Sequence, residues 1–237
     1  MNADENLLIE RRDASLWITL NRSDKANALS VGMMQSAAAA LNAAADDPAV
    51  KAVIFAGSGH RAFCAGVDVR EQPADGDVDA FRLKRSAALA ALLDAVLDAP
   101  KPVVAVLNGI ASGAGAMLAL LCDARVAVDT AALSLPEINL GMATFTGATI
   151  AFQIGGHVLA TDLVQSGRRM PAAEALTRGL VSSLVSRDEL DATGARIAAE
   201  LAHKDAKAFA ANKQWLNRPM KAALAVARAE HERHRRT

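Results

Sequence analysis

Two short turns in the sequence combine glycine with other small residues just before an apolar run. The first turn is Arg61–Asp68, and the second is Asn108–Ala116. Small side chains let a ligand approach the main chain closely, and the first turn of a helix leaves peptide NH groups without intrahelical partners. Such NH groups can bind an oxyanion. Either turn taken alone could equally serve tight packing, but the pair favours a site that stabilises negative charge on a carbonyl oxygen.

Other catalytic motifs are not supported by the spacing of the candidate residues. The glycines from Gly109 to Gly115 do not form G-x-G-x-x-G, and G-x-x-x-x-G-K-[ST] does not occur. Ser112 does not lie in G-x-S-x-G, the turn that presents a nucleophilic serine. The five histidines have no ligand spacing such as H-E-x-x-H, so we expect no metal site.

Alternating strands and helices are expected to position these turns. Apolar runs at 7–11 and 16–20 predict a hairpin, and Ser30 is placed to cap a helix that ends near residue 45. Further apolar or helical patterns lie at 50–56, 81–97, 103–107, 114–122 and 125–128. This alternation predicts an α/β fold with a largely parallel sheet.

The C-terminal part of the chain has mainly helical periodicity. From about Thr144 onward only 180–185 is strand-like. The tail 188–236 is expected to form two or three helices, with a break at 217–219 because Pro219 lacks a peptide NH.

Composition indicates an ordinary globular protein. Of 237 residues, 52% are hydrophobic and 22% charged, and the 26 basic side chains balance the 26 acidic ones. The balance removes the electrostatic reason to expect nucleic acid or an anionic membrane as a partner. Cys64 and Cys122 lie in apolar runs, the first ten residues do not resemble a signal peptide, and no apolar run is long enough to span a membrane. We therefore expect a cytoplasmic protein.

Taken together, the motifs resemble the crotonase family, also called the enoyl-CoA hydratase/isomerase family. The matching pieces occur in the same order across almost the whole chain. They are Asn21-Arg22 with Asn27–Ser30, Ala62–Asp68, Asn108-Gly109 with Gly113–Gly115 and Cys122-Asp123, Leu135–Glu137 with Leu140-Gly141, and Ser166–Arg168 with Ala172, Ala175 and Gly179–Val181.

The resemblance implies a spiral of ββα units over residues 1–185 and a helical C-terminal region over 186–237, within one continuous domain. It also implies a homotrimer or a dimer of trimers, with coenzyme A bound as part of the substrate and no separate cofactor. The NH groups of Ala65 and Ala114 are expected to form an oxyanion hole. The resemblance places the substrate and CoA site at Lys25, Ala26, Asn27, Ala28, Ala65, Gly66, Val67, Asp68, Gly113 and Met117.

The expected acid and base groups depart from the pattern of the hydratases. Hydratases of the family use two glutamates around one water, and here those positions hold Met117 and Glu137. Methionine cannot transfer a proton. One carboxylate is enough for the family's isomerases, which move a proton from C2 of a 3-enoyl thioester to C4. An apolar Met117 would raise the pKa of Glu137, although a methionine at this helical spacing is also ordinary core filling.

We therefore favour an enoyl-CoA isomerase of fatty acid metabolism with Glu137 as its single base. A lyase-type activity, hydration with one carboxylate, is the second reading. A non-catalytic acyl-CoA-binding or scaffold protein is the third, because the stretch 142–147 replaces a common family turn. Asp68 is interpreted as structural, and Cys64 as a buried structural thiol.

Overall fold

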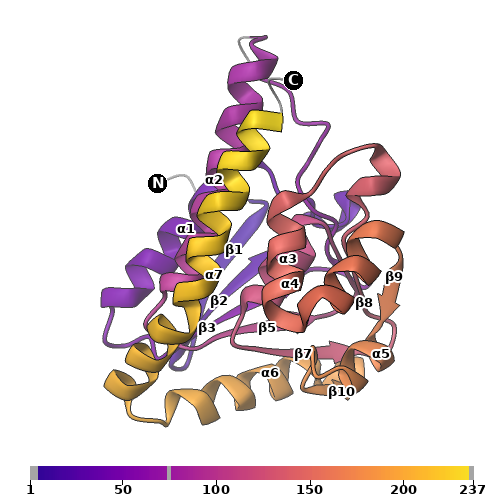
Figure 1. Ribbon diagram of the computed structural model, residues 1–237. Helices are drawn as coiled ribbons and strands as arrows, with labels where there is room; N and C mark the ends of the chain where they lie inside the picture. The colour runs from indigo at the N-terminus through magenta and orange to yellow at the C-terminus, as the bar shows by residue number, and fades with distance from the viewer. Residues whose placement is uncertain (1–4, 74–75, 235–237) are drawn as a thin grey trace.

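The fold is built on two sheets of unequal size. The computed structural model describes residues 5–73 and 76–234 (Figure 1). A six-stranded sheet has the order β1-β2-β3-β5-β7-β10, and a smaller sheet has the order β4-β6-β8-β9. The large sheet comprises β1 (Leu7–Arg12), β2 (Ser15–Leu20), β3 (Ala52–Gly57), β5 (Val103–Leu107), β7 (Ala124–Val128) and β10 (Ser183–Val185).

The large sheet is parallel apart from its first hairpin. β1 and β2 pair antiparallel, while β2-β3, β3-β5, β5-β7 and β7-β10 all pair in parallel. Every residue of β5 and nearly every residue of β3 is buried, as expected for parallel strands with both faces covered. The predicted hairpin and parallel sheet are confirmed.

The smaller sheet creates the repeating ββα unit. It contains β4 (Ala62–Cys64), β6 (Ile110–Ser112), β8 (Ala132–Ser134) and β9 (Arg169–Pro171). β3 leads to β4, β5 to β6 and β7 to β8, and each pair is followed by a helix. The expected ββα spiral is confirmed. We did not predict these short strands, because three residues are too few to show a periodicity.

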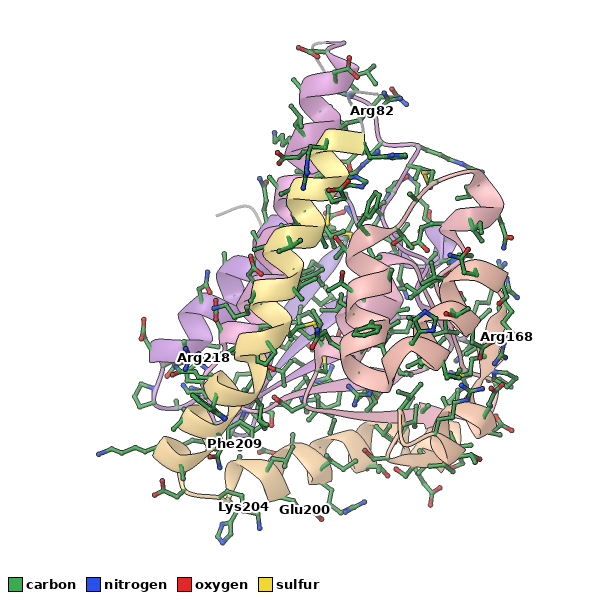
Figure 2. All side chains as sticks on the ribbon, in the orientation of Figure 1. Arg82, Arg168, Glu200, Lys204, Phe209 and Arg218 are labelled. Atoms are coloured by element: carbon green, nitrogen blue, oxygen red, sulfur yellow. The ribbon has the colours of Figure 1, made fainter. Side chains whose placement is uncertain are left out.

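Helices cover the large sheet and join its units. α1 (Val31–Asp46) begins at Ser30, whose hydroxyl accepts the NH of Met33 at 3.1 Å, so the predicted cap is confirmed. α1 packs along α2 (Val78–Asp98), and α3 (Ala114–Leu121) is buried at every residue. α6 (Arg187–Ala202) packs across β3, β5 and β7, and side chains such as Glu200 point outward from it (Figure 2).

The C-terminal helix contradicts one prediction. α7 (Ala206–His234) continues through Pro219 instead of breaking at 217–219. It packs against α2 and against α4 (Phe145–Ala160), and Asn217 Nδ2 donates to the carbonyl of Leu97 at 2.9 Å (Figure 1). The packing on two neighbours offsets the lost helical hydrogen bond. In the part of the chain that the structure describes, no helix has the length and apolar character needed to cross a membrane.

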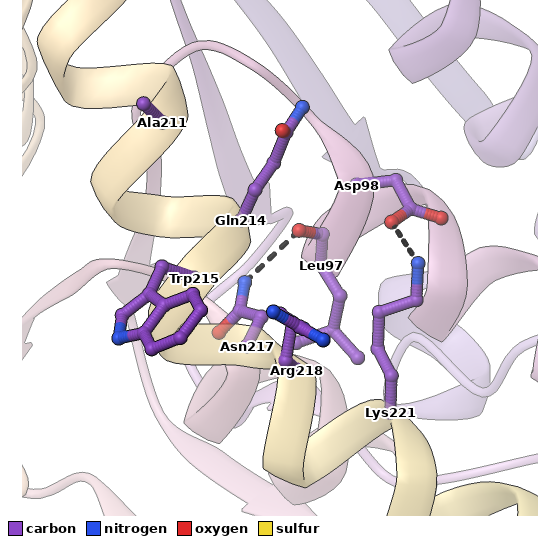
Figure 3. Close-up of a pocket in the computed structure, with 8 residues that line it drawn as sticks. All are labelled: Leu97, Asp98, Ala211, Gln214, Trp215, Asn217, Arg218 and Lys221. Atoms are coloured by element: carbon purple, nitrogen blue, oxygen red, sulfur yellow. Dashed lines mark hydrogen bonds and ion pairs between the residues drawn. The ribbon is translucent and has the colours of Figure 1, made fainter.

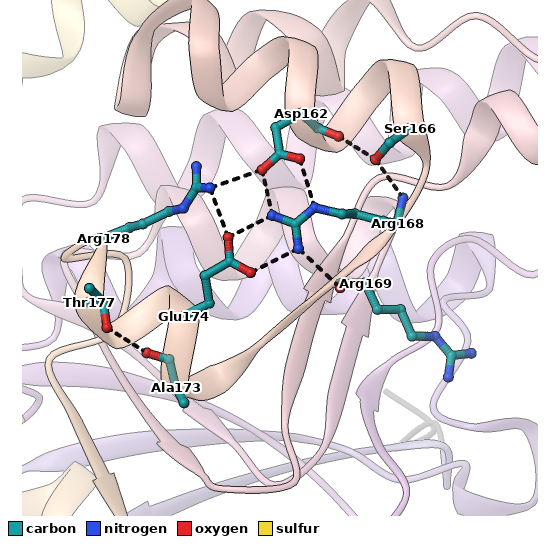
Figure 4. A network of polar contacts seen from close by, with 8 residues as sticks. All are labelled: Asp162, Ser166, Arg168, Arg169, Ala173, Glu174, Thr177 and Arg178. Carbon is teal, nitrogen blue, oxygen red and sulfur yellow. Dashed lines mark hydrogen bonds and ion pairs between the residues drawn. The ribbon is translucent and has the colours of Figure 1, made fainter.

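A charged network fastens the segment between the two sheets. It joins η3 (Thr161–Gln165), β9 and α5 (Ala172–Thr177). The Arg168 guanidinium binds both Asp162 and Glu174, and Arg178 binds the same two carboxylates (Figure 4). The hydrogen bonds from Arg168 hold the pKa of Asp162 below its usual range. Two arginines shared between two carboxylates give a fixed geometry that a single exposed pair would lack.

A buried ion pair anchors α7 to the core. Lys213 Nζ lies 2.7 Å from Asp123 Oδ2 and donates to the carbonyl of Lys101 at 3.2 Å. The same Asp123 oxygen accepts the NH of Val103 at 2.8 Å, at the start of β5. Only 4% of the Lys213 side chain is exposed, so removing its charge leaves a largely buried carboxylate without its cation.

We predict that Lys213→Met lowers the free energy of unfolding by about 2–4 kcal/mol, because breaking a buried pair from one side leaves the other charge uncompensated. Urea unfolding monitored by circular dichroism measures the change. The matched control is Lys221→Met on the same helix, which removes an exposed pair with Asp98 and should cost less than about 1 kcal/mol. Equal costs for the two variants would contradict the anchoring role of Lys213.

Candidate active site

The two glycine-containing turns meet at one edge of the small sheet. β4 and β6 are neighbouring parallel strands, so the turns that follow them leave the sheet at the same edge. A Cβ atom built on Gly66 would lie 3.2 Å from the carbonyl oxygen of Ser112 and 3.6 Å from the peptide nitrogen of Ala114. The two main chains are therefore in contact, which satisfies the first requirement for a shared site.

The second turn presents the start of a helix. Gly113 has φ 53° and ψ −124°, a conformation that side-chain-bearing residues rarely adopt, and its NH donates to Ser134 at 2.9 Å. α3 begins at the next residue, and the first hydrogen bond of its ladder runs from Met117 NH to Gly113 O at 3.0 Å. The NH of Ala114 therefore belongs to the helix N-terminus, where no intrahelical acceptor exists.

The first turn corrects one predicted oxyanion donor. The NH of Ala65 donates to the carbonyl of Ala26 at 3.0 Å, so it is already occupied. Val67 instead faces Leu29 in a parallel bridge in which Leu29 NH binds Gly66 O and Asp68 NH binds Leu29 O, each at 2.8 Å. In such a bridge the NH of the central residue points away from its partner. Val67 NH has no acceptor among the described residues and is the donor that this turn can offer.

Asn27 lies in the predicted CoA loop but has a different part in it. Its side chain is fully buried, Oδ1 accepts the NH of Arg22 at 2.9 Å, and Nδ2 donates to the carbonyl of Ala62 at 2.8 Å. The side chain cannot contact a ligand while it holds these partners, so its expected place in the lining of the CoA site is corrected to support of the loop. Lys25 is exposed, and Ala26 and Ala28 are half-buried, so these three residues are accessible in the loop.

The carboxylate of Asp68 is likewise taken up by the protein. Arg22 Nη2 lies 3.0 Å from Asp68 Oδ2, and the NH of Arg70 donates to Oδ1 at 3.0 Å. Burial by itself would raise the pKa of Asp68, but these two donors outweigh it and the pKa lies below its ordinary value. Asp68 therefore fixes the first turn, as its structural reading predicted, and its carboxylate is not available to line the CoA site. We had assigned no role to Arg22.

Glu137 is the carboxylate that faces the meeting point of the turns. It opens η2 (Glu137–Leu140), just after β8, and its Oε1 lies 3.4 Å from the position that a Cβ on Gly113 would occupy. Its Oε2 is buried and has no hydrogen-bond partner in the described part of the chain. Burial raises the pKa of Glu137, although the residue's own NH and the Thr144 hydroxyl oppose the shift. A carboxylate in this setting is suited to accepting and returning a proton.

Apolar groups surround this carboxylate from the side of α3. Met117 is 5% exposed and packs in the core, as its structural reading predicted. A Cβ on Gly147 would lie 2.9 Å from Met117 Cε and 3.2 Å from Leu135 Cδ2. The Met117 side chain therefore ends beside the first turn of α4, next to the segment that follows Glu137.

Cys64 lies close to both turns without a reactive setting. A Cβ on Gly115 would be 2.3 Å from the carbonyl oxygen of Cys64, so Gly115 allows α3 to pack directly on the first turn. The thiol is completely buried, and burial raises its pKa to about 12. A protonated, enclosed thiol is not a nucleophile, which agrees with its interpretation as structural.

Two further residues near the site were not found from the sequence. Thr144 hydrogen-bonds Glu137, and the ring of Phe145 lies edge-on to His231 and His234 with centroids 6.0 and 5.5 Å away. The only signal for Thr144 was its place before an apolar helical run, where a threonine is expected to cap the helix. The contacts of Phe145 cross 86 residues or more of chain, and no local pattern indicates them.

A separate surface pocket has no part in this site. It has a volume of about 670 Å³ and lies between the end of α2 and the middle of α7 (Figure 3). Its lining contains an exposed Trp215 and the surface pair of Asp98 with Lys221. It shares no residue with either turn or with Glu137.

The site combines a helix N-terminus, a second accessible peptide NH and one buried carboxylate, which is the equipment of an enzyme that moves protons beside a polarised carbonyl. The sequence profile of the family described as enoyl-CoA hydratase/isomerase matches residues 10–236. The chain belongs to this family, and the resemblance to crotonases is confirmed. It is an enzyme of the enoyl-CoA hydratase/isomerase family.

Individual relatives carry hydratase names. The chain is 37% identical over 225 residues to a probable enoyl-CoA hydratase of Rhizobium meliloti, covering 93% of this chain and 84% of that one. It is 35% identical over 225 residues to the 2,3-dehydroadipyl-CoA hydratase of Escherichia coli, covering 94% and 86%. The crystal structure of an enoyl-CoA hydratase from Mycobacterium avium subsp. paratuberculosis superposes with a TM-score of 0.85 at 31% identity, over 98% of this chain and 92% of that one.

We predict that Glu137→Gln stabilises the folded protein increasingly as the pH rises above about 4.5, the ordinary pKa of glutamate. Because the folded-state pKa of Glu137 is raised, its favourable contribution is present at low pH and is lost as the pH rises through that pKa. Glutamine does not titrate. Urea unfolding at a series of pH values measures the difference between the variant and the natural protein.

The control for that series is Glu200→Gln, which changes an exposed carboxylate on α6. Its stability difference from the natural protein should stay nearly constant over the same pH range. A constant difference for Glu137→Gln as well would contradict the buried, uncompensated state of the Glu137 carboxylate.

Proposed function

We propose that this protein is an enoyl-CoA isomerase that converts 3-enoyl-CoA to 2-enoyl-CoA with Glu137 as its single acid and base. The observation that carries the proposal is the buried Glu137 carboxylate at the Gly113–Ala114 turn, with an unpaired Oε2, in a chain that has Met117 where the hydratase pattern has a glutamate. One carboxylate can remove a proton and return the same proton. It cannot also supply the second proton-transfer group of the two-glutamate hydratase pattern.

The thioester carbonyl is proposed to bind between the two turns. Removal of a proton from C2 places negative charge on the thioester oxygen, and two preorganised NH groups stabilise that charge more than they stabilise the neutral carbonyl. The donors are the NH groups of Val67 and Ala114, with Val67 replacing the occupied Ala65. Each such donor supplies roughly 3 kcal/mol of transition-state stabilisation in enzymes that use this device.

The proton transfer then follows from the position of Glu137. The carboxylate breaks the C2–H bond, and the released electron pair is delocalised onto the thioester oxygen as a dienolate. The protonated Glu137 returns its proton to C4, the C3–C4 double bond is lost and a C2–C3 double bond forms. The raised pKa of Glu137 brings it closer to the working pH, which favours both the uptake and the return of the proton.

Met117 supports isomerisation over the addition of water. Its thioether is a weak acceptor, so it cannot hold a water as a carboxylate does. The second candidate is hydration with Glu137 alone, and it is favoured by the hydratase names of the relatives. The third is binding of acyl-CoA without turnover. The reactions of purified protein with 3-enoyl-CoA and 2-enoyl-CoA distinguish these three candidates.

The remaining properties are proposed from the family and from the surface. Coenzyme A enters as part of the substrate beside the Lys25–Ala28 loop, and no other cofactor is required for the proton transfer. A homotrimer or a dimer of trimers is supported by apolar side chains exposed on α7, namely Trp215, Leu216 and Val226. A cytoplasmic location is supported by the unpaired, buried thiols of Cys64 and Cys122. Light scattering of the purified protein measures the assembly.

We predict that Glu137→Gln lowers the rate of 3-enoyl-CoA isomerisation by about 10²–10⁴-fold, because the amide cannot accept the C2 proton. The formation of 2-enoyl-CoA is followed spectroscopically over several acyl chain lengths. Glu200→Gln on the surface should retain the natural rate. Isomerisation that is unaffected by Glu137→Gln would refute the proposal, and CoA binding without any turnover would favour a non-catalytic role.

We predict that Met117→Glu adds measurable hydration of 2-enoyl-CoA, because it restores the pair of carboxylates that the family's hydratases use around one water. Met117→Leu keeps the apolar character and should leave both hydration and isomerisation near their natural rates. Water addition is measured as loss of the conjugated enoyl absorbance. Strong hydration by the natural protein would instead favour the one-carboxylate hydratase.

A further inference from the structure

We propose that Thr144 is a positioning residue for Glu137, with its hydroxyl donating a hydrogen bond that holds the Glu137 carboxyl toward the Gly113–Ala114 turn. The inference deepens the proposed function, since it concerns the group that we propose as the acid and base. The existence of the bond is nevertheless measurable without any substrate.

The first argument is the conformation of Thr144 itself. It occupies the N-cap position of α4, where a threonine side chain normally accepts an NH from the first helical turn. Here the side chain makes no capping hydrogen bond, while the carbonyl of Thr144 accepts the NH of Ala148 at 2.8 Å. The helix therefore starts at Thr144 without using its hydroxyl, and the hydroxyl is left for another acceptor.

The second argument is the location of that hydroxyl. A Cβ on Gly147 would lie 2.6 Å from Thr144 Oγ1 and 2.9 Å from Met117 Cε, so both groups converge on the same point of α4. Gly147 leaves the space that they fill. The hydroxyl thus lies beside the apolar end of Met117, where a hydrogen bond to a carboxylate is poorly screened by water and correspondingly strong.

The third argument is the scarcity of other partners for Glu137. Within the described residues, Glu137 takes part in no ion pair, and the groups that hydrogen-bond its carboxyl are its own NH and the Thr144 hydroxyl. Thr144 is therefore the side chain that can restrict the rotation of this carboxyl. Because Oε2 remains without a partner, one oxygen stays available to receive a proton.

The segment that carries Thr144 is itself held in place. The next residue, Phe145, contacts the rings of His231 and His234 near the end of α7. The packing of α4 against α7 fixes the same segment from the side. A hydroxyl on a fixed main chain can orient its acceptor, whereas a hydroxyl on a free loop would follow it.

The direct test is a pH titration of the protein labelled with ¹³C at the glutamate carboxyls, with the Glu137 signal identified by its absence in Glu137→Gln. In Thr144→Val the hydroxyl is replaced by a methyl group of similar size, and we expect the Glu137 titration to move upward by about one pH unit because the ionised form loses a donor. Thr144→Ser should keep the natural midpoint. Thr144→Ala replaces the valine variant if the latter does not fold.

The control is Thr177→Val on α5, which removes a hydroxyl that donates to Ala173 far from Glu137. It should leave the Glu137 titration unchanged. An unchanged Glu137 midpoint in Thr144→Val or Thr144→Ala, or a shift in Thr144→Ser as large as in Thr144→Val, would overturn the inference whether or not the protein proves to be an isomerase.

The kinetic consequence separates this inference from the proposed function. We expect Thr144→Val to lower kcat by about tenfold with little change in KM, and to move the acidic limb of the pH profile upward, with Thr144→Ser restoring both. If Glu137→Gln remains active, the proposed function fails. If Glu137→Gln is inactive but Thr144→Val keeps the natural kcat and pH profile, only the positioning role of Thr144 fails.

Discussion

The close approach of two main chains at the ends of β4 and β6 is the constraint on which the site depends. Gly66 touches the Ser112–Ala114 backbone, and Gly115 lets α3 lie directly on the carbonyl of Cys64. A side chain at either position would push the turns apart. The NH groups of Val67 and Ala114 can act on one oxygen only if that separation stays small, because electrostatic stabilisation falls steeply with distance and geometry. Packing and catalysis therefore make the same demand on these glycines.

The rest of the site is arranged around that contact by groups that bind no ligand themselves. Asn27 ties the neighbouring loop to Ala62, and Arg22 neutralises Asp68. These polar side chains satisfy one another, so their burial costs little. Glu137 is the exception, since one of its oxygens is buried without a partner. A protein keeps such an unfavourable group where a reaction uses it, which is why we assign the chemistry to this residue.

Family membership and reaction type rest on different parts of the molecule. The ββα spiral, the turns and the overall match to hydratases define the family. The choice between adding water and moving a proton depends on a few side chains near Glu137, chiefly Met117 and Thr144. Folds are shared by enzymes of different activity for this reason, and the names of relatives carry less weight here than the chemistry of those positions.

The sequence by itself determined the alternating strands and helices, the two turns and the single carboxylate, because these follow from local periodicity and residue type. Only the tertiary structure decided which groups are free. It showed that Ala65 NH is bound to Ala26, that Asn27 is enclosed, and that α7 runs through Pro219 on the support of its neighbours. The partners of these groups come from other segments of the chain, and hydrogen bonding and burial between distant segments leave no local pattern.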